Sequence, residues 1–173
     1  MINGKTVLGV IPARKDSKRF PGKNRSLFRG KPLFQWTVEE ALKSEYLDQI
    51  TLTTDDPLLL EMSHEFPINR IGRPVNLSTD EASTEDVLKW VLTIHSFDIV
   101  VLLQPTSPLR TVEDIDTCIS MFHVKPVVSY GENGRNGAVY VCSSQTIDFT
   151  DNIPYLMPQE RSLDVDYKED VGL

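Results

Sequence analysis

The sequence predicts an α/β fold, in which a mostly parallel sheet carries helices on both faces in a three-layer arrangement. Residues 5–11 and 98–103 are apolar on both faces, which is typical of strands buried in the middle of a parallel sheet. Segments with helical periodicity alternate with such strands along the chain. The 173 residues contain no internal repeat or linker and have an ordinary hydrophobic content of 40%, so one domain over residues 1–173 is expected.

The individual elements follow from apolar spacing and capping residues. The strand at 5–11 leads into a long loop, 12–31, that Pro and Gly residues interrupt. Ser83, with Asp86 at the third position after it, is expected to cap a helix that ends at 94. Thr111 is expected to cap a helix that ends near 122. The other expected elements are a helix at 34–44, a strand at 49–53, a helix at 58–65, strands at 98–103, 126–130 and 138–142, and a last helix from about 167.

Charge is distributed unevenly along the chain, whose net charge is −7. Residues 1–31 contain nine of the 18 Lys and Arg residues and one acid, so this segment carries +8 and the remaining 142 residues carry −15. The acidic net charge argues against general nucleic-acid binding, whereas a basic block in an acidic protein favours binding of an anionic ligand.

Composition also argues against several other classes of protein. Cys118 and Cys142 have no His nearby in sequence, so neither a disulfide framework nor a zinc site is expected. No apolar run approaches the roughly 20 residues of a membrane span. The run at 7–11 is too short for the core of a signal peptide. We therefore expect a cytoplasmic protein that does not associate with membranes.

The first loop has the residue types of a phosphate-binding loop. Residues 11–24 read I-P-A-R-K-D-S-K-R-F-P-G-K-N and include five cations and a Pro-Gly turn. Cations and exposed backbone N–H groups in a loop after a strand can hold a triphosphate. The loop is not a P-loop, and no G-x-G-x-x-G follows the strand. A solvated basic loop is the alternative. In parallel sheets ligands bind outside the carboxyl ends of the strands, where this loop and those at 54–57 and 104–110 are expected.

The chain resembles the CMP-sugar synthetases, which include the acylneuraminate cytidylyltransferases and the legionaminic- and pseudaminic-acid enzymes. The first loop matches the N-terminal signature of that family. Five further segments occur in the order of the family: T-T-D-D-P (53–57), R-P-V-N-L-S-T-D-E-A-S-T-E-D-V (73–87), L-L-Q-P-T-S-P-L-R (102–110), R-N-G-A-V-Y-V (135–141) and R-S-L-D-V-D-Y-K-E-D (161–170). CMP-Kdo synthetases share only part of the first-loop pattern and are the weaker match.

The resemblance implies a nucleotide-diphosphosugar-transferase (Rossmann-like) fold and a cytidylyltransferase reaction. CTP and an acidic nonulosonic sugar, such as a sialic acid, would give a CMP-sugar and pyrophosphate with Mg²⁺ as cofactor. Family roles carry over to matching positions, as follows: CTP binding by Arg14, Ser17, Lys23, Asn24, Arg73, Ser78 and Asp80; sugar binding by Gln104 and Arg135; metal binding by Asp164 and Asp166; and catalysis by Arg14, Lys23, Asp164 and Asp166.

The spacing of Asp164 and Asp166 independently suits a metal. Side chains at i and i+2 of an extended segment share a face, so both carboxylates can face one cation. Mg²⁺ typically binds one or two carboxylates together with phosphate oxygens and water. A pair of solvated acids is the alternative that the spacing alone leaves open.

The chain departs from the family pattern in two places. Lys15-Asp16 replaces a Gly-Gly pair in the first loop, and the residues at 131–134 replace a long excursion that supplies dimer contacts and part of the sugar pocket. Such a Gly/Asn turn typically closes a hairpin. The swapped dimer of the family is therefore not expected, and a monomer or a homodimer through another surface is. A different nucleotidyltransferase of this fold and a non-catalytic nucleotide-binding remnant are the rival functions.

Three further expectations concern structural roles. Asp55 and Asp56 are expected to cap the following helix. Arg110 is expected to form a structural ion pair. His64, His95 and His123 fall in expected helices without a shared spacing, so no catalytic histidine is predicted.

Overall fold

A computed structural model describes residues 1–172. Its central feature is a seven-stranded sheet with the order β5-β4-β1-β6-β8-β7-β9. Only β8 runs antiparallel to its neighbours, β6 and β7, so the predicted mostly parallel sheet is confirmed. The strands are β1 (Val7–Pro12), β4 (Gln49–Thr54), β5 (Asn69–Gly72), β6 (Ile99–Leu102), β7 (Val127–Gly131), β8 (Gly134–Ser143) and β9 (Ile153–Leu156).

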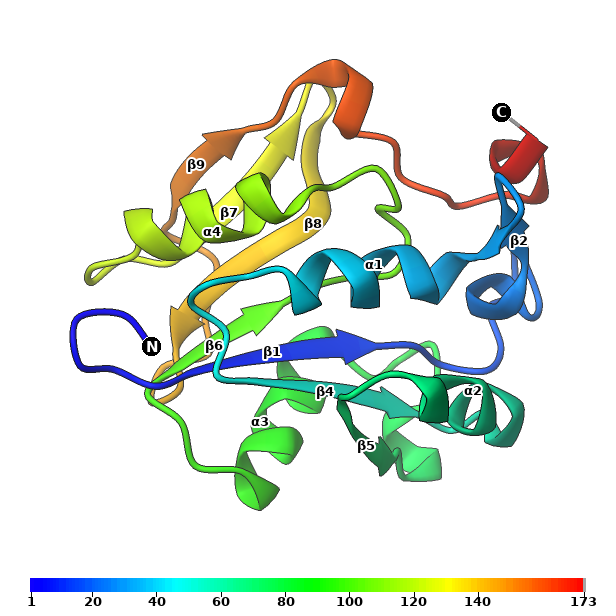
Figure 1. The fold of residues 1–173 in the computed structure, drawn as a ribbon, viewed down its shortest axis with the longest axis horizontal. Coiled ribbons are helices and arrows are strands. Elements are labelled where there is room, and N and C mark those ends of the chain that lie inside the picture. Colours follow the sequence, from blue (N-terminus) through cyan, green and yellow to red (C-terminus); the bar gives the residue numbers. More distant parts are fainter. Residues whose placement is uncertain (173) are drawn as a thin grey trace.

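Helices cover both faces of the sheet, which confirms the three-layer arrangement (Figure 1). On one face, α1 (Leu33–Leu42) and α4 (Val112–Met121) bury apolar side chains against the sheet, and α2 (Pro57–Met62) adds Leu59 to the same core. On the other face, α3 (Thr84–Ile94) packs Leu88 and Val91 against Leu8 and Val10 of β1. Successive β1 residues thus enter opposite cores, as alternation along a strand requires.

The predicted helix caps form. The Ser83 hydroxyl accepts a hydrogen bond from the backbone N–H of Asp86 at 3.1 Å. Thr111 and Asp114 form a capping box at the start of α4. Asp56 caps α2 by accepting from the N–H of Leu58 at 3.0 Å, with Pro57 in the first turn. Local sequence therefore fixes where these three helices begin.

Short elements at the edges were not predicted. The edge strands β5 and β9 carry little strand signal in their sequences: β5 reads N-R-I-G, and β9 contains Pro154, which an edge strand tolerates because one side needs no backbone donor.

The expected last helix is instead a 3₁₀ turn, and α4 ends before His123. The remaining short elements are the hairpin of β2 (Leu27–Phe28) and β3 (Lys31–Pro32) and the 3₁₀ turns η1 (Lys23–Arg25), η2 (Ser63–Glu65), η3 (Val75–Leu77), η4 (Gln159–Arg161) and η5 (Lys168–Gly172).

The turn at 131–134 closes a hairpin, as predicted. Gly131 of β7 pairs with Gly134 of β8, which leaves two residues in the connection. Gly134 has a φ of +108°, a conformation that favours glycine. Among residues 1–172, no helix is long and apolar enough to cross a membrane.

Candidate active site

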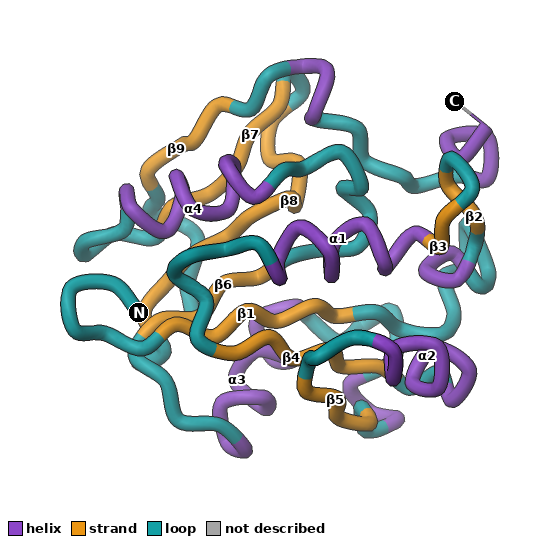
Figure 2. The backbone as a smooth tube through the Cα atoms, in the orientation of Figure 1, coloured by secondary structure: helices purple, strands orange, loops and turns teal. Residues whose placement is uncertain are grey.

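A pocket lies at the carboxyl edge of the sheet, where the loops gather at the right of Figure 2. Its cavity volume is 270 Å³. The structure brings seven of the predicted site residues to its wall, namely Arg14, Ser17, Lys23, Asn24, Arg73, Asp80 and Gln104. They come from the loops after β1, β5 and β6 and from the segment before α3, because parallel strands end at one edge of the sheet.

Internal hydrogen bonds shape the first loop. The Asn24 amide donates to the carbonyl of Arg14 at 3.0 Å, which closes the loop on itself. Asp55 accepts from the backbone N–H of Lys15 at 2.7 Å, and the buried Asp56 accepts from Arg25 Nε at 2.6 Å. Asp55 therefore anchors the loop rather than capping α2, and Asp56 does both. These contacts hold the loop in place around Lys15 and Asp16.

The C-terminal segment lies against this loop, and Figure 1 shows η5 beside β2. Val165 is fully buried with Phe20 and Phe28, and its N–H donates to the carbonyl of Thr106 at 2.7 Å. Lys23 Nζ donates to the Val165 carbonyl at 3.1 Å and lies 3.9 Å from Asp166 Oδ1. Burial lowers the pKa of Lys23, and the two aspartates next to Val165 oppose that shift.

Asp164 and Asp166 flank the inward-facing Val165, so both carboxylates leave the buried side of the segment. Although the Asp164 side chain reaches solvent, the surrounding chain desolvates it and raises its pKa, and Asp166 raises it further. In residues 1–172, no three His, Cys, Asp or Glu side chains are grouped to hold a metal. A pair of carboxylates suits Mg²⁺ completed by phosphate oxygens and water, not an all-protein site.

Asp80 lies in the pocket, but its contacts are with the cations of the first loop. Arg14 Nη1 lies 2.6 Å from Asp80 Oδ1, and Lys18 Nζ lies 3.1 Å from Asp80 Oδ2. The hydrogen bonds from Lys18 and Arg14 hold the pKa of Asp80 below its ordinary value. Asp80 thus neutralises part of the charge that an anionic ligand would meet.

We expect Asp80→Asn to tighten binding of a triphosphate by about two- to fivefold, the range of an exposed ion pair. The substitution frees Arg14 and Lys18 without changing the shape of the pocket. Calorimetric titration with CTP at low salt measures the effect, and Glu81→Gln, which removes the neighbouring exposed charge, is the control. Weaker binding in Asp80→Asn alone would mean that Asp80 itself contacts the ligand.

Arg73 is buried at the pocket wall. Its guanidinium donates to the carbonyls of Thr53 at 3.2 Å and Leu77 at 3.4 Å, while Nε has no hydrogen-bond partner in the described chain. Burial lowers its pKa to about 10. Buried polar groups are ordinarily satisfied, so a donor left without a partner at a pocket wall is typical of a binding site.

Arg110 was expected to form an ion pair, and that expectation is wrong. Its guanidinium is 1% exposed and donates to the carbonyls of Ala138 at 2.8 Å and Gln104 at 2.6 Å and to the Thr37 hydroxyl at 3.0 Å. Arg110 therefore joins α1 and β8 to the loop after β6, which carries Gln104.

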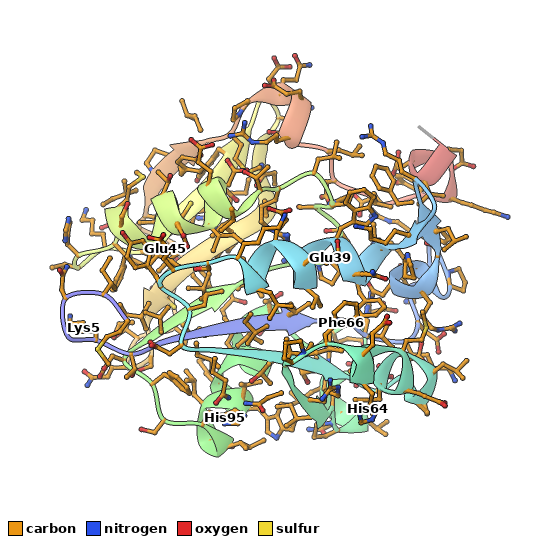
Figure 3. All side chains as sticks on the ribbon, in the orientation of Figure 1. Lys5, Glu39, Glu45, His64, Phe66 and His95 are labelled. Carbon is orange, nitrogen blue, oxygen red and sulfur yellow. The ribbon has the colours of Figure 1, made fainter. Side chains whose placement is uncertain are left out.

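Four predicted site residues are not among those that line the cavity: Asp164 and Asp166, described above, and Ser78 and Arg135. The Ser78 hydroxyl donates to the Pro74 carbonyl at 2.9 Å, which commits it to its own turn. Arg135 begins β8 and donates to the Phe149 carbonyl at 2.7 Å. It lies at the same sheet edge but not on the pocket wall. No histidine is among the residues described at the wall, and Figure 3 places His64 beside α2 and His95 at the end of α3.

Comparison with known proteins decides the family. The sequence profile described as "Cytidylyltransferase" matches residues 8–147, which include all but the first residue of β1, the pocket loops and the whole of β8. The chain belongs to the cytidylyltransferase family.

Two curated relatives are similar to this cytidylyltransferase-family chain. N-acylneuraminate cytidylyltransferase of Escherichia coli O18:K1:H7 is 26% identical over 212 residues, with 96% of this chain and 51% of the relative covered. CMP-N,N'-diacetyllegionaminic acid synthase of Legionella pneumophila is 38% identical over 134 residues, with 71% of this chain and 56% of the relative covered. The chain thus spans about half the length of these relatives. The first alignment is longer than the 173-residue chain, so the relative carries extra residues inside the matched region, consistent with a shortened segment here.

A solved structure shows the same fold. CMP:2-keto-3-deoxy-manno-octonic acid synthetase complexed with CTP is 27% identical, with a TM-score of 0.64 over 73% of this chain and 52% of that one. The nucleotidyltransferase fold that the resemblance implied is therefore confirmed for this member of the cytidylyltransferase family.

Sequence reasoning missed part of the pocket wall. Uncharged residues complete the wall. They come from the end of β1, from the segment before α3 and its first turn, and from the turn after β6: Pro12, Thr79, Ala82, Ser83, Thr84, Val87, Pro105 and Thr106. Most of them lie inside motifs that the sequence had singled out, but a small uncharged side chain gives no sign that it will line a cavity.

Proposed function

We propose that this chain transfers CMP from CTP to an acidic nonulosonic sugar and releases pyrophosphate. The observation that carries the proposal is the juxtaposition of Arg14 and Lys23, at the pocket wall, with Asp164 and Asp166 beside Lys23. Cations for a triphosphate and a carboxylate pair for its metal thus meet at one edge of the sheet. The names of the similar proteins support a cytidylyltransferase reaction and an acidic keto sugar as acceptor.

The reaction requires the anomeric hydroxyl of the sugar to attack the α-phosphate of CTP. Asp164 and Asp166 would hold Mg²⁺, which supplies Lewis-acid activation of the phosphate when bound. Arg14 and Lys23 would orient the triphosphate and stabilise the charge that develops on it. Gln104 would contact the sugar, and Arg135, at the outer end of β8, would meet its carboxylate. Asp164 is also the candidate acceptor of the hydroxyl proton.

A pyrophosphate-release assay tests the proposal. CTP and Mg²⁺ are supplied with sialic, legionaminic and pseudaminic acids and with Kdo, and the other nucleoside triphosphates serve as controls. We expect release with CTP and at least one nine-carbon acid. Release with Kdo alone would identify the alternative acceptor class, and CTP binding without release on any sugar would identify a non-catalytic nucleotide-binding protein.

Arg14→Ala and Lys23→Ala should each weaken the binding of CTP more than the binding of CMP. Losing a hydrogen bond to a charged group should weaken CTP binding by roughly 10- to 100-fold. CMP, which lacks the outer phosphates, should lose less. Calorimetric titration with both nucleotides measures the difference, and Lys15→Ala is the matched control, because Lys15 is an exposed cation of the same loop. Equal losses for CMP and CTP would place the loop away from the outer phosphates.

The hairpin turn at 131–134 predicts the mode of association. At about 3.3–3.6 Å per extended residue, this turn cannot reach the pocket of a second subunit. We therefore expect a monomer, or a homodimer through another surface, when light scattering is measured at micromolar concentration. A dimer in which residues 127–140 enter the partner's pocket would contradict this expectation, and crosslinking from a cysteine placed at Glu132 would detect it.

A further inference from the structure

Gly137 of β8 lies directly against the side chain of Gln104. A Cβ atom at position 137 would stand 2.8 Å from Gln104 Oε1 and 3.1 Å from its Cδ. Cβ atoms essentially never approach another atom as closely as 2.8 Å, and 3.1 Å is tighter than most such contacts, so any other residue must push the carboxamide aside. Gly137 also has a φ of +72°, in the left-handed region that favours glycine.

The two backbones that carry Gly137 and Gln104 are held together by buried contacts. Arg110 donates to the carbonyls of Gln104 and Ala138, and the Ser107 hydroxyl donates to the carbonyl of Asn136 at 3.3 Å. The Asn136 side chain accepts from Ser129 at 2.6 Å and from the N–H of Ala138 at 3.1 Å. Because neither backbone is free to retreat, a methyl group at 137 must displace the Gln104 side chain.

Two other glycines allow the effect of backbone conformation to be measured apart from the effect of a close neighbour. Gly30, in the β2–β3 turn, has a φ of +81°, and Gly134, on the same strand as Gly137, has a φ of +108°. A Cβ at either position would meet no atom within 4 Å. Alanine at these positions therefore costs only backbone strain, whereas alanine at 137 adds a collision with a pocket side chain.

We propose that Gly137 is a positioning residue that sets the place of the Gln104 carboxamide at the pocket wall and thereby selects the sugar. The inference rests on the proposed function, in which Gln104 meets the acceptor and not the nucleotide. Gly137→Ala should therefore impair use of the sugar and leave CTP binding intact. A displaced polar group at an active site can lower kcat/KM by about 100-fold for each ångström, so a loss of at least about tenfold is expected.

A double-mutant cycle tests the contact itself. Unfolding of the wild type, Gly137→Ala, Gln104→Ala and the double variant is followed by denaturant titration, with Gly30→Ala and Gly134→Ala as controls for backbone strain. The midpoint for Gly137→Ala should fall further than for Gly30→Ala, whose φ of +81° is the closer match to the +72° of Gly137. In the Gln104→Ala background, which removes the colliding atoms, the same change should cost no more than the controls. Additive losses would overturn the contact.

Enzyme kinetics and ligand titration test whether Gly137 affects use of the sugar. In Gly137→Ala, the KM for the sugar should rise while the Kd for CTP stays within about twofold of the wild type, since only a misplaced acceptor contact is involved. Gly137→Ala should have no further effect on the sugar in the Gln104→Ala background. Equal loss of CTP affinity would overturn the selection of the sugar by Gly137. Absence of turnover in the wild type would count against the proposed function alone, and sugar titration by NMR would then decide the role of Gly137.

Discussion

Asp166→Asn is expected to lower turnover by about 100-fold or more, the scale on which one electrostatic contact to a transition state acts, while leaving the fold intact. The side chain of Asp166 is 46% exposed, and its ion pairs with Arg19 and Lys23 are both 3.9 Å long. Such exposed pairs stabilise a fold little. Half the carboxylate charge of the proposed cation site is lost, however, because Asp164 is its only other carboxylate.

Pyrophosphate release at saturating CTP measures this effect, and calorimetric titration with Mg²⁺ in the presence of a CTP analogue measures the loss of cation binding independently of turnover. Asp164→Asn should behave similarly. Glu169→Gln removes an exposed carboxylate of the same segment and is the matched control. Near-wild-type rates and Mg²⁺ binding in both aspartate variants would show that the cation binds elsewhere.

Arg110→Ala is expected to destabilise the protein by roughly 3 kcal/mol or more, because it removes the guanidinium donor from the buried Ala138 carbonyl and the buried Thr37 hydroxyl, each at a cost of about 1–3 kcal/mol. It also opens a cavity under the loop after β6. Burial lowers the pKa of Arg110 to about 10, so a charged guanidinium is less favourable in the folded than in the unfolded chain. That penalty diminishes only as the pH rises above 10, so the loss on substitution should not vary between pH 6 and 8.

Denaturant unfolding at several pH values in this range measures the loss for Arg110→Ala. Arg110→Lys keeps the charge but cannot reach three acceptors with one ammonium group, so an intermediate loss is expected. Arg29→Ala removes an exposed arginine from the β2–β3 turn and should leave the midpoint nearly unchanged. A loss below about 1 kcal/mol for Arg110→Ala, the worth of one ordinary hydrogen bond, would mean that water replaces the guanidinium.

The sequence predicted those parts of the fold that local signals determine. Continuous apolar runs marked β1 and β6, because a strand buried on both faces needs apolar side chains at successive positions. Ser83 and Thr111 marked the starts of α3 and α4, because a cap needs only the next three residues. The edge strands β5 and β9 were not predicted. Each has a neighbouring strand on one side only, and its pairing depends on that strand rather than on its own composition.

The residues of the candidate site also divide into those that the sequence indicated and those whose contacts only the tertiary structure determined. The resemblance to the CMP-sugar synthetases singled out Arg14, Lys23 and Arg73 as ligand contacts and Asp164 and Asp166 as a metal pair. The cations of the first loop and the spacing of the two aspartates independently suit a triphosphate and its cation. Tertiary structure alone decided that Asp80 pairs with Arg14, that Arg110 donates to the Ala138 carbonyl rather than to a carboxylate, and that Gly137 lies against Gln104. Each of these contacts joins segments that are distant in sequence, and the register of the sheet and the burial of the loops determine which atoms meet.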